Sequence, residues 1–146
     1  MSYESLADGG FATGTMMGSG GFIAFDEDQC IVRNTWNFTR FYHHESCGQC
    51  SPCREGTGWM EKVLHRLEYG HGKMSDMDLL VDVSKKIEGN TICPLGDAAA
   101  WPVASAIRHF RDEFEWHVTN AAEAVSRNYG LAHYADPLPK PEENVA

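Results

Sequence analysis

Three cysteines inside seven residues constrain this chain more than any other feature of its sequence. Cys47, Cys50 and Cys53 follow one another at C-x2-C-x2-C spacing. Two intervening residues let a loop turn its thiolates toward one point, and a remote fourth cysteine can complete the set. Cys93, followed directly by a proline, is the candidate for that fourth position. This pattern predicts a cubane iron–sulfur cluster.

Other kinds of site also use closely spaced cysteines. A structural zinc site pairs one C-x2-C with a second one or with two histidines. The second pair is missing here, although His43 or His44 could supply nitrogen ligands. A redox-active C-x-x-C pair needs a βαβ context that nothing nearby supplies. Three cysteines this close are too crowded to be ordinary buried core residues. A zinc-stabilised interaction module stays open as the non-redox alternative.

Charge and cysteine count exclude several classes of function. The chain has 146 residues and a formal net charge of −9, which argues against nucleic-acid binding and offers no basic patch for anionic lipid. No apolar run approaches the ~20 residues that span a bilayer, and the sequence predicts no signal peptide at Met1. Five cysteines are an odd number, which fits a reducing compartment better than a disulfide framework. Cys30, the one left over, lies among apolar neighbours and is expected to be a small buried hydrophobe.

The sequence of residues 1–33 indicates a connecting arm rather than a nucleotide-binding domain. Residues 1–21 are rich in glycine, but they contain no G-x-G-x-x-G, and the only nearby strand follows the glycines instead of preceding them. Residues 22–25 (Phe-Ile-Ala-Phe) predict that one short strand, which needs a pairing partner outside this chain. We therefore predict no residue that binds FMN or NAD.

Residues 34–130 predict a mainly α fold, a small four-helix bundle with the cluster at one end. The helical pattern starts at Asn34, and a second helix is expected to begin near Arg54. Ser75-x-x-Asp78 resembles a capping box for the third helix. The last helix is expected to start at Asp97 and to carry a long apolar stripe that includes Phe110. Residues 131–146, with Pro-Leu-Pro-Lys-Pro, predict a disordered tail.

This helix arrangement places the three close cysteines just before a helix N-terminus, where free N–H groups favour an anionic cluster. Arg54 adds a positive charge there, or is simply a solvated first-turn residue. Gly48, Gln49, Ser51 and Thr91 could donate backbone hydrogen bonds to the sulfurs and tune the reduction potential. No side chain is a credible acid, base or nucleophile, so we predict no catalytic residue and a role in one-electron transfer.

Three stretches together resemble one known family. They are residues 45–56 (Glu-Ser-Cys-Gly-Gln-Cys-Ser-Pro-Cys-Arg-Glu-Gly), residues 91–102 (Thr-Ile-Cys-Pro-Leu-Gly-Asp-Ala-Ala-Ala-Trp-Pro) and residues 108–111 (Arg-His-Phe-Arg). The family is the NADH- and flavin-binding subunit of respiratory NADH:quinone oxidoreductase, or complex I. The likeness runs over about residues 1–118 and covers only the C-terminal portion of that subunit. The corresponding subunits of NAD-linked hydrogenases and formate dehydrogenases are similar in this region.

The resemblance implies that the four cysteines ligate a 4Fe–4S cluster within a larger electron-transfer chain. NADH-reduced FMN, bound in a domain expected upstream of Met1, would deliver electrons, and residues 1–33 would link to that domain. Iron–sulfur clusters in neighbouring subunits would pass the electrons on toward quinone. The resemblance also implies a place in the peripheral arm of a membrane-bound complex, on the cytoplasmic or matrix side. The isolated chain is expected not to oxidise NADH.

Overall fold

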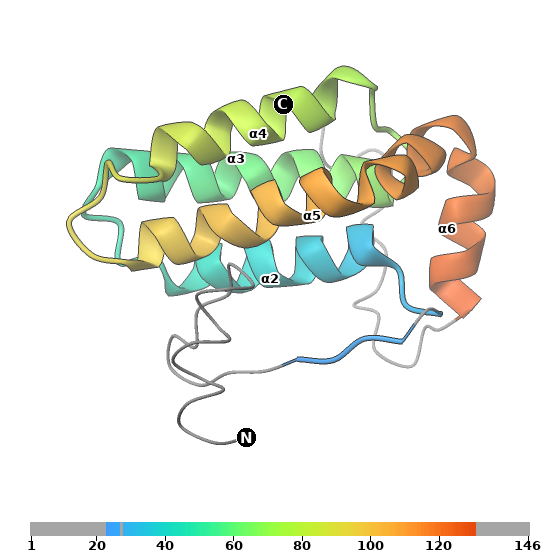
Figure 1. The fold of residues 1–146 in the computed structure, drawn as a ribbon, viewed down its shortest axis with the longest axis horizontal. Helices are drawn as coiled ribbons and strands as arrows, with labels where there is room; N and C mark the ends of the chain where they lie inside the picture. The colour runs from blue at the N-terminus through green and yellow to red at the C-terminus, as the bar shows by residue number, and fades with distance from the viewer. Residues whose placement is uncertain (1–22, 27, 131–146) are drawn as a thin grey trace.

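The computed structural model describes residues 23–26 and 28–130, and every regular element within those ranges is an α-helix. Helices α2, α3, α4 and α5 lie side by side as a bundle, and α6 folds across one end of it (Figure 1). The mainly α fold and the four-helix bundle are therefore confirmed. The helices are α2 (Ile31–Glu45), α3 (Ser51–Glu68), α4 (Ser75–Ile87), α5 (Leu95–Thr119) and α6 (Ala121–Gly130).

The predicted short strand is wrong in the part of the chain that can be checked. Residues 23–26 have no regular secondary structure, and the remaining strand residue, Phe22, lies outside the described residues. A lone strand has no neighbour to receive its backbone hydrogen bonds, so extended chain is the expected outcome. Phe25 packs its ring against Phe38 of α2, with centroids 5.9 Å apart. The glycine-rich residues 1–21 and the predicted tail at 131–146 also lie outside the described residues.

The helix α2 begins at Ile31 rather than at Asn34, and Cys30 supplies its N-cap. The Cys30 thiol accepts a hydrogen bond from the backbone N–H of Arg33. Cys30 is buried, as its apolar neighbours predicted. The apolar stripe predicted on α3 is also confirmed, because all of its members are almost completely buried in the core between the helices. They are Met60, Val63, Leu64 and Leu67.

Two glycines in α3 let neighbouring helices approach closely. A Cβ at Gly56 would lie 2.7 Å from Ile87 of α4, and one at Gly58 would lie 2.8 Å from the ring of His43. Both glycines are buried inside a helix that begins at Ser51. Tight helix packing therefore accounts for both glycines.

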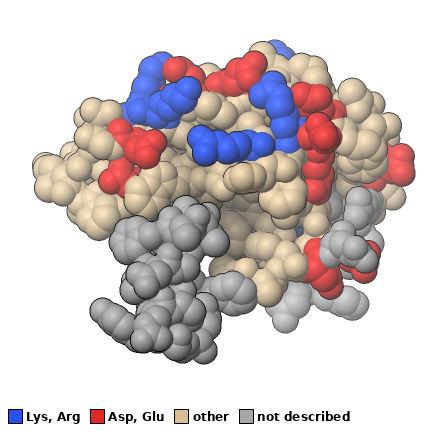
Figure 2. Space-filling view, in the orientation of Figure 1, with Lys and Arg blue, Asp and Glu red and all other residues tan. Residues whose placement is uncertain are grey.

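The capping box predicted for α4 is wrong. Met74 is the N-cap of α4, and Ser75 is already helical. The buried Asp76 carboxylate instead accepts a hydrogen bond from the backbone N–H of Lys73, at 2.9 Å, and forms an ion pair with Arg66. A charged carboxylate is a stronger acceptor than a serine hydroxyl, so Asp76 rather than Ser75 accepts the side-chain hydrogen bond at the start of α4. Acidic and basic side chains intermingle on the face shown in Figure 2, without a large patch of one sign.

Helix α5 begins at Leu95, ahead of Asp97, and its regular geometry breaks at Phe110. The backbone of Phe110 has φ −131° and ψ 30°, whereas Pro102 is accommodated within the helix. The break turns Phe110 outward, and its side chain is exposed, so its predicted place in the buried stripe is wrong. Phe114, after the break, returns to the core.

Candidate metal centre

Two loops meet at one end of the bundle, and all four predicted ligand cysteines lie there. One loop joins α2 to α3 and the other joins α4 to α5 (Figure 1). The thiols of Cys47, Cys50, Cys53 and Cys93 line one cavity of about 100 Å³. All four thiols are free of disulfide bonds. The other residues that line this cavity are Glu45, Ser46, Gln49, Thr91 and Leu95.

The first loop feeds directly into α3, which begins earlier than the sequence predicted. Cys50 is the N-cap of α3, Pro52 lies in its first positions, and Cys53 is in its first turn. A proline suits this place because the first helical N–H groups have no partner inside the helix. The N-terminal end of α3 therefore faces the cysteine cavity with the positive end of its dipole, which favours an anionic cluster.

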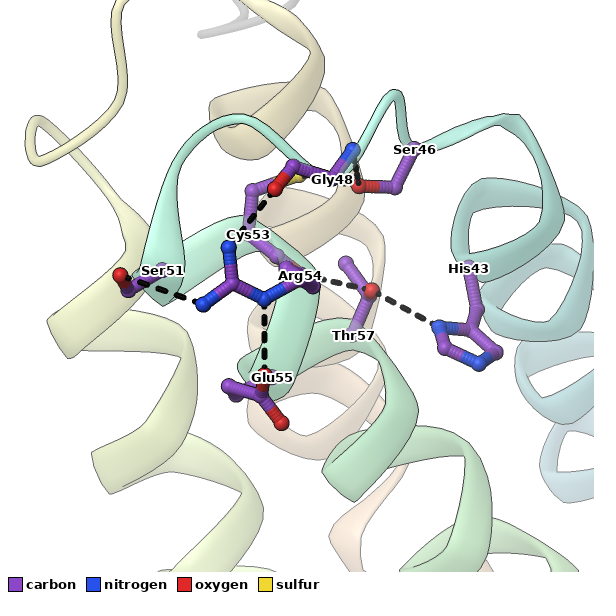
Figure 3. Close-up of polar contacts among 8 residues, drawn as sticks. All are labelled: His43, Ser46, Gly48, Ser51, Cys53, Arg54, Glu55 and Thr57. Carbon is purple, nitrogen blue, oxygen red and sulfur yellow. Dashed lines mark hydrogen bonds and ion pairs between the residues drawn. The ribbon is translucent and has the colours of Figure 1, made fainter.

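Arg54 holds the first loop in shape, as Figure 3 shows. Its guanidinium donates to the carbonyl of Gly48 at 2.7 Å and to the hydroxyl of Ser51 at 3.5 Å, and it pairs with Glu55 at 2.8 Å. Gly48 has φ 77°, a conformation that L side chains rarely adopt, so the turn between the first two cysteines requires glycine. Arg54 thus brings a positive charge close to the cavity and also braces the loop that carries Cys47.

Ser46 makes a contact that the sequence reasoning missed. Its Oγ lies 3.2 Å from the Sγ of Cys53 and also accepts the backbone N–H of Gly48 at 3.3 Å. Either atom can donate in this contact, but a cysteine that ligates a cluster has lost its proton, so Ser46 would then be the donor. A hydroxyl directly before the first cysteine was the sequence signal that could have found it.

The second loop is joined to the first by a hydrogen bond to sulfur. The backbone N–H of Ile92 donates to Cys50 Sγ at 3.4 Å. Thr91 donates its hydroxyl to the carbonyl of Cys93 at 3.0 Å, and it fits closely against Gly96, where a Cβ would lie 2.4 Å from the Thr91 hydroxyl. Ile92 was also missed, because its approach to Cys50 depends on the tertiary fold.

The predicted supporting residues all lie around this end of the bundle. Gln49 and Thr91 line the cavity, whereas Gly48, Ser51 and Arg54 form the braced turn beside it. Backbone donation from Gly48, Gln49, Ser51 and Thr91 to cluster sulfurs stays a prediction.

The two histidines that could have supported a zinc site point elsewhere. His43 Nδ1 lies 3.2 Å from the hydroxyl of Thr57, which donates to the Cys53 carbonyl (Figure 3). His44 is exposed and pairs with Glu45. Neither histidine lines the cysteine cavity. Four cysteines therefore line the cavity and no histidine does, which suits an iron–sulfur cluster better than a zinc site with histidine ligands.

A helical bundle with four thiols around a cavity at one end has the form of an iron–sulfur-binding domain. The chain belongs to the family described as the NADH-ubiquinone oxidoreductase-F iron-sulfur binding region, which matches residues 33–117. This membership confirms the family resemblance and the 4Fe–4S cofactor predicted from the sequence.

Several relatives are named as F subunits of NADH-quinone oxidoreductase. The protein of Rickettsia akari (strain Hartford) is 48% identical over 126 residues, covering 86% of this chain and 29% of that protein. The protein of Rickettsia bellii (strain OSU 85-389) is 51% identical over 115 residues, covering 79% and 27%. The chain therefore spans less than a third of the length of these relatives.

A solved structure shares the fold. The crystal structure of an NAD+-reducing NiFe-hydrogenase in the H2-reduced state is similar with a TM-score of 0.61 and 30% sequence identity. The match covers 77% of this chain and 21% of that chain.

None of the helices in the described part of the chain combines the length and the apolar character of a membrane span.

Proposed function

We propose that this chain transfers electrons one at a time through a 4Fe–4S cluster ligated by Cys47, Cys50, Cys53 and Cys93. The single cavity that all four thiols line is the observation that supports this assignment most strongly. Soft thiolates favour iron–sulfur clusters over hard cations, and a cubane cluster takes four of them. When bound, the cluster supplies a centre that gains or loses one electron.

The residues around the cavity would hold the cluster and set its reduction potential. The N-terminal end of α3 and the Arg54 guanidinium both favour the added negative charge of the reduced state. Hydrogen bonds from Ser46 and Ile92 to cysteine sulfurs act in the same direction. Electron transfer through the cluster would require no proton transfer and no covalent step from these residues.

From its family, we further propose that the chain works inside an NADH:quinone oxidoreductase. NADH gives up a hydride, which carries two electrons, whereas a cubane cluster takes one, so FMN must stand between them. FMN and NADH would bind in a domain upstream of this chain, linked by residues 1–33 to the cluster domain at 34–130. Clusters of neighbouring subunits would carry the electrons on toward quinone. The chain would then belong to the peripheral arm, on the cytoplasmic or matrix side of the membrane.

A second host has specific support. The NAD+-reducing NiFe-hydrogenase shares the fold at 30% identity, so the equivalent subunit of an NAD-linked hydrogenase is the alternative. The same cluster would then lie between a flavin and a hydrogenase centre. Mass spectrometry of the native assembly, which identifies the subunits that travel with this chain, separates the two hosts.

Cluster composition tests the function directly. Anaerobic reconstitution should give a brown protein with about four irons and four sulfides per chain, whose visible absorbance bleaches on reduction. A colourless protein with one zinc and no sulfide would support the non-redox interaction module instead.

Two cysteine variants form a matched pair that tests the ligand assignment. Cys93→Ser should lose iron and the reduced-state electron paramagnetic resonance (EPR) signal, because it removes one of the four thiols of the cavity. Cys30→Ser should keep both, since Cys30 caps the opposite end of α2. Loss of the signal in the Cys30 variant, with Cys93 dispensable, would reverse the assignment.

A further inference from the structure

Three side chains with metal-binding atoms meet at the opposite end of the bundle from the cysteine cavity. The candidate ligand atoms of Cys30, Glu113 and His117 all lie within 4.8 Å of one another. Cys30 Sγ is 3.1 Å from His117 Nε2. Glu113 and His117 are four residues apart on α5 and so share one face of that helix. Cys30 reaches them from the start of α2.

This cluster is separate from the predicted iron–sulfur site. Helix α2 is 15 residues long, so its two ends lie about 22 Å apart along the helix axis. Cys30 is 5% exposed and His117 is 2% exposed, whereas Glu113 is partly buried. A polar group buried this deeply must satisfy its hydrogen-bonding or ligand capacity inside the protein.

Cys30 stands directly before the first turn of α2, where its sulfur serves as a hydrogen-bond acceptor. Its Sγ accepts the backbone N–H of Arg33 at 3.4 Å, at the positive end of the α2 dipole. Glu113 accepts the backbone N–H of Ile31 at 2.9 Å through Oε1. A carboxylate has a second oxygen, so this hydrogen bond does not use up its ligand capacity.

We propose that Cys30, Glu113 and His117 form a binding site for Zn2+. Thiolate, imidazole and carboxylate are the ligands that zinc takes in proteins, and three of them leave one tetrahedral position for water or another donor. A single thiolate is too few for an iron–sulfur cluster, and sulfur disfavours Mg2+ and Ca2+.

The bound ion would tie the start of α2 to the part of α5 that follows the break at Phe110. Helix α5 loses regular geometry at Phe110, so the segment carrying Glu113 and His117 depends on contacts with other elements for its position. Zinc would supply such a contact without any redox role of its own. It would therefore stabilise the end of the bundle that lies away from the electron-transfer centre.

Without a metal, the same three side chains would have a purely structural role, and the Cys30–His117 distance differs between the two cases. A thiol–imidazole hydrogen bond explains the 3.1 Å separation, and Glu113 then serves only as a cap for α2. In a tetrahedral zinc site the sulfur and nitrogen would stand about 3.5 Å apart, as Zn–S and Zn–N lengths of about 2.3 and 2.0 Å dictate. Zinc binding thus requires the Cys30–His117 pair to open by only about half an ångström.

X-ray absorption at the zinc edge tests the proposal on the unmodified, cluster-loaded chain. After incubation with one equivalent of Zn2+ and desalting, we expect about one zinc per chain, with iron and sulfide unchanged. The spectrum should show one sulfur neighbour at about 2.3 Å and nitrogen or oxygen neighbours at about 2.0 Å. A shell of several sulfurs would place the zinc among the cluster cysteines, and a chain that retains no zinc would equally overturn the proposal.

Variants then assign the ligands. Cys30→Ser and His117→Gln should each weaken zinc binding by at least about tenfold, measured by competition with a chromophoric chelator. His109→Gln, an exposed histidine on the same helix, is the matched control and should bind zinc like the parent. Equal zinc affinity in the parent and in both ligand variants would overturn the proposal. Circular dichroism distinguishes a variant that has lost a ligand from one that has not folded. If a variant does not fold, the X-ray absorption spectrum of the unmodified chain still tests whether zinc binds at this site.

Discussion

Removing the hydroxyl of Ser46 should lower the reduction potential of the cluster. Its Oγ lies 3.2 Å from Cys53 Sγ, and a cluster-ligating thiolate has no proton, so the Ser46 hydroxyl would donate to that sulfur. A hydrogen bond to a ligand sulfur stabilises the reduced cluster more than the oxidised one, because the reduced cluster carries one more negative charge. Ser46→Ala removes this preference and leaves the backbone of the loop intact.

The magnitude follows from the strength of one such bond. Hydrogen bonds to charged groups contribute about 1.5–3 kcal/mol. We take the bond to be stronger by about 1 kcal/mol when the cluster is reduced than when it is oxidised. For a one-electron couple 59 mV corresponds to about 1.36 kcal/mol, so the potential should fall by about 40 mV.

Potentiometric titration followed by EPR measures this shift. Ser46→Thr keeps a hydroxyl and should stay close to the parent, and the extended backbone at Ser46 tolerates a β-branched side chain. Ser51→Ala removes a hydroxyl that contacts Arg54, and should shift the potential less. An unchanged or raised potential in Ser46→Ala, with iron content intact, would refute the proposed direction of the Ser46 hydrogen bond.

Three further predictions concern the scaffold and its response to pH. Gly56→Ala should destabilise the fold by about 1–2 kcal/mol, because its Cβ would lie 2.7 Å from the buried Ile87, an overpacking that outweighs the gain in helix propensity. Arg66→Gln should cost about 3 kcal/mol, since it leaves the 1% exposed Asp76 carboxylate without its counter-charge. Burial and then the charge of a neighbouring histidine lower the pKa of His65 below 6.5, so stability should be full above pH 6.5 and should fall as the pH drops through the lower folded pKa. Anaerobic denaturant unfolding measures the first two, and an NMR titration of the His65 ring measures the third.

Each of these predictions has a control within the chain. Gly58→Ala gives the same gain in helix propensity, but its Cβ meets the half-exposed His43 ring, which can rotate away, so it should cost less than Gly56→Ala. Lys86→Gln breaks an exposed pair with Asp82 and should change stability by less than about 0.5 kcal/mol. A cost for Lys86→Gln as large as that for Arg66→Gln, or a pKa of His65 at or above 6.5, would contradict the reasoning.

The features that follow from local periodicity and motif were predictable from the sequence. The spacing of Met60, Val63, Leu64 and Leu67 specifies one face of a helix, and all four are buried in the core. The tight cysteine triplet required a loop, and the structure brings the distant Cys93 into the same cavity. Both loops join helices that pack against each other, which is why neighbouring helix ends could place them together.

The features that depend on tertiary contacts could not be predicted in this way. The hydrogen bond from Ile92 to Cys50 links residues 42 positions apart, and no local pattern encodes it. Asp76 displaces the predicted cap because it is buried against Arg66, a partner on another helix. No proline or glycine lies at the helical break at Phe110, so the sequence predicted an uninterrupted apolar stripe there.

The central claim is that four thiols of this chain hold a one-electron iron–sulfur centre, and spin quantitation tests it most directly. The anaerobically reconstituted chain should be diamagnetic as oxidised, and chemical reduction should produce an EPR signal that integrates to about one spin per chain. That signal should disappear in Cys93→Ser and persist in Cys30→Ser. A reduced protein that carries about four irons and yet gives no such spin, or a signal that survives the loss of Cys93, would contradict the account.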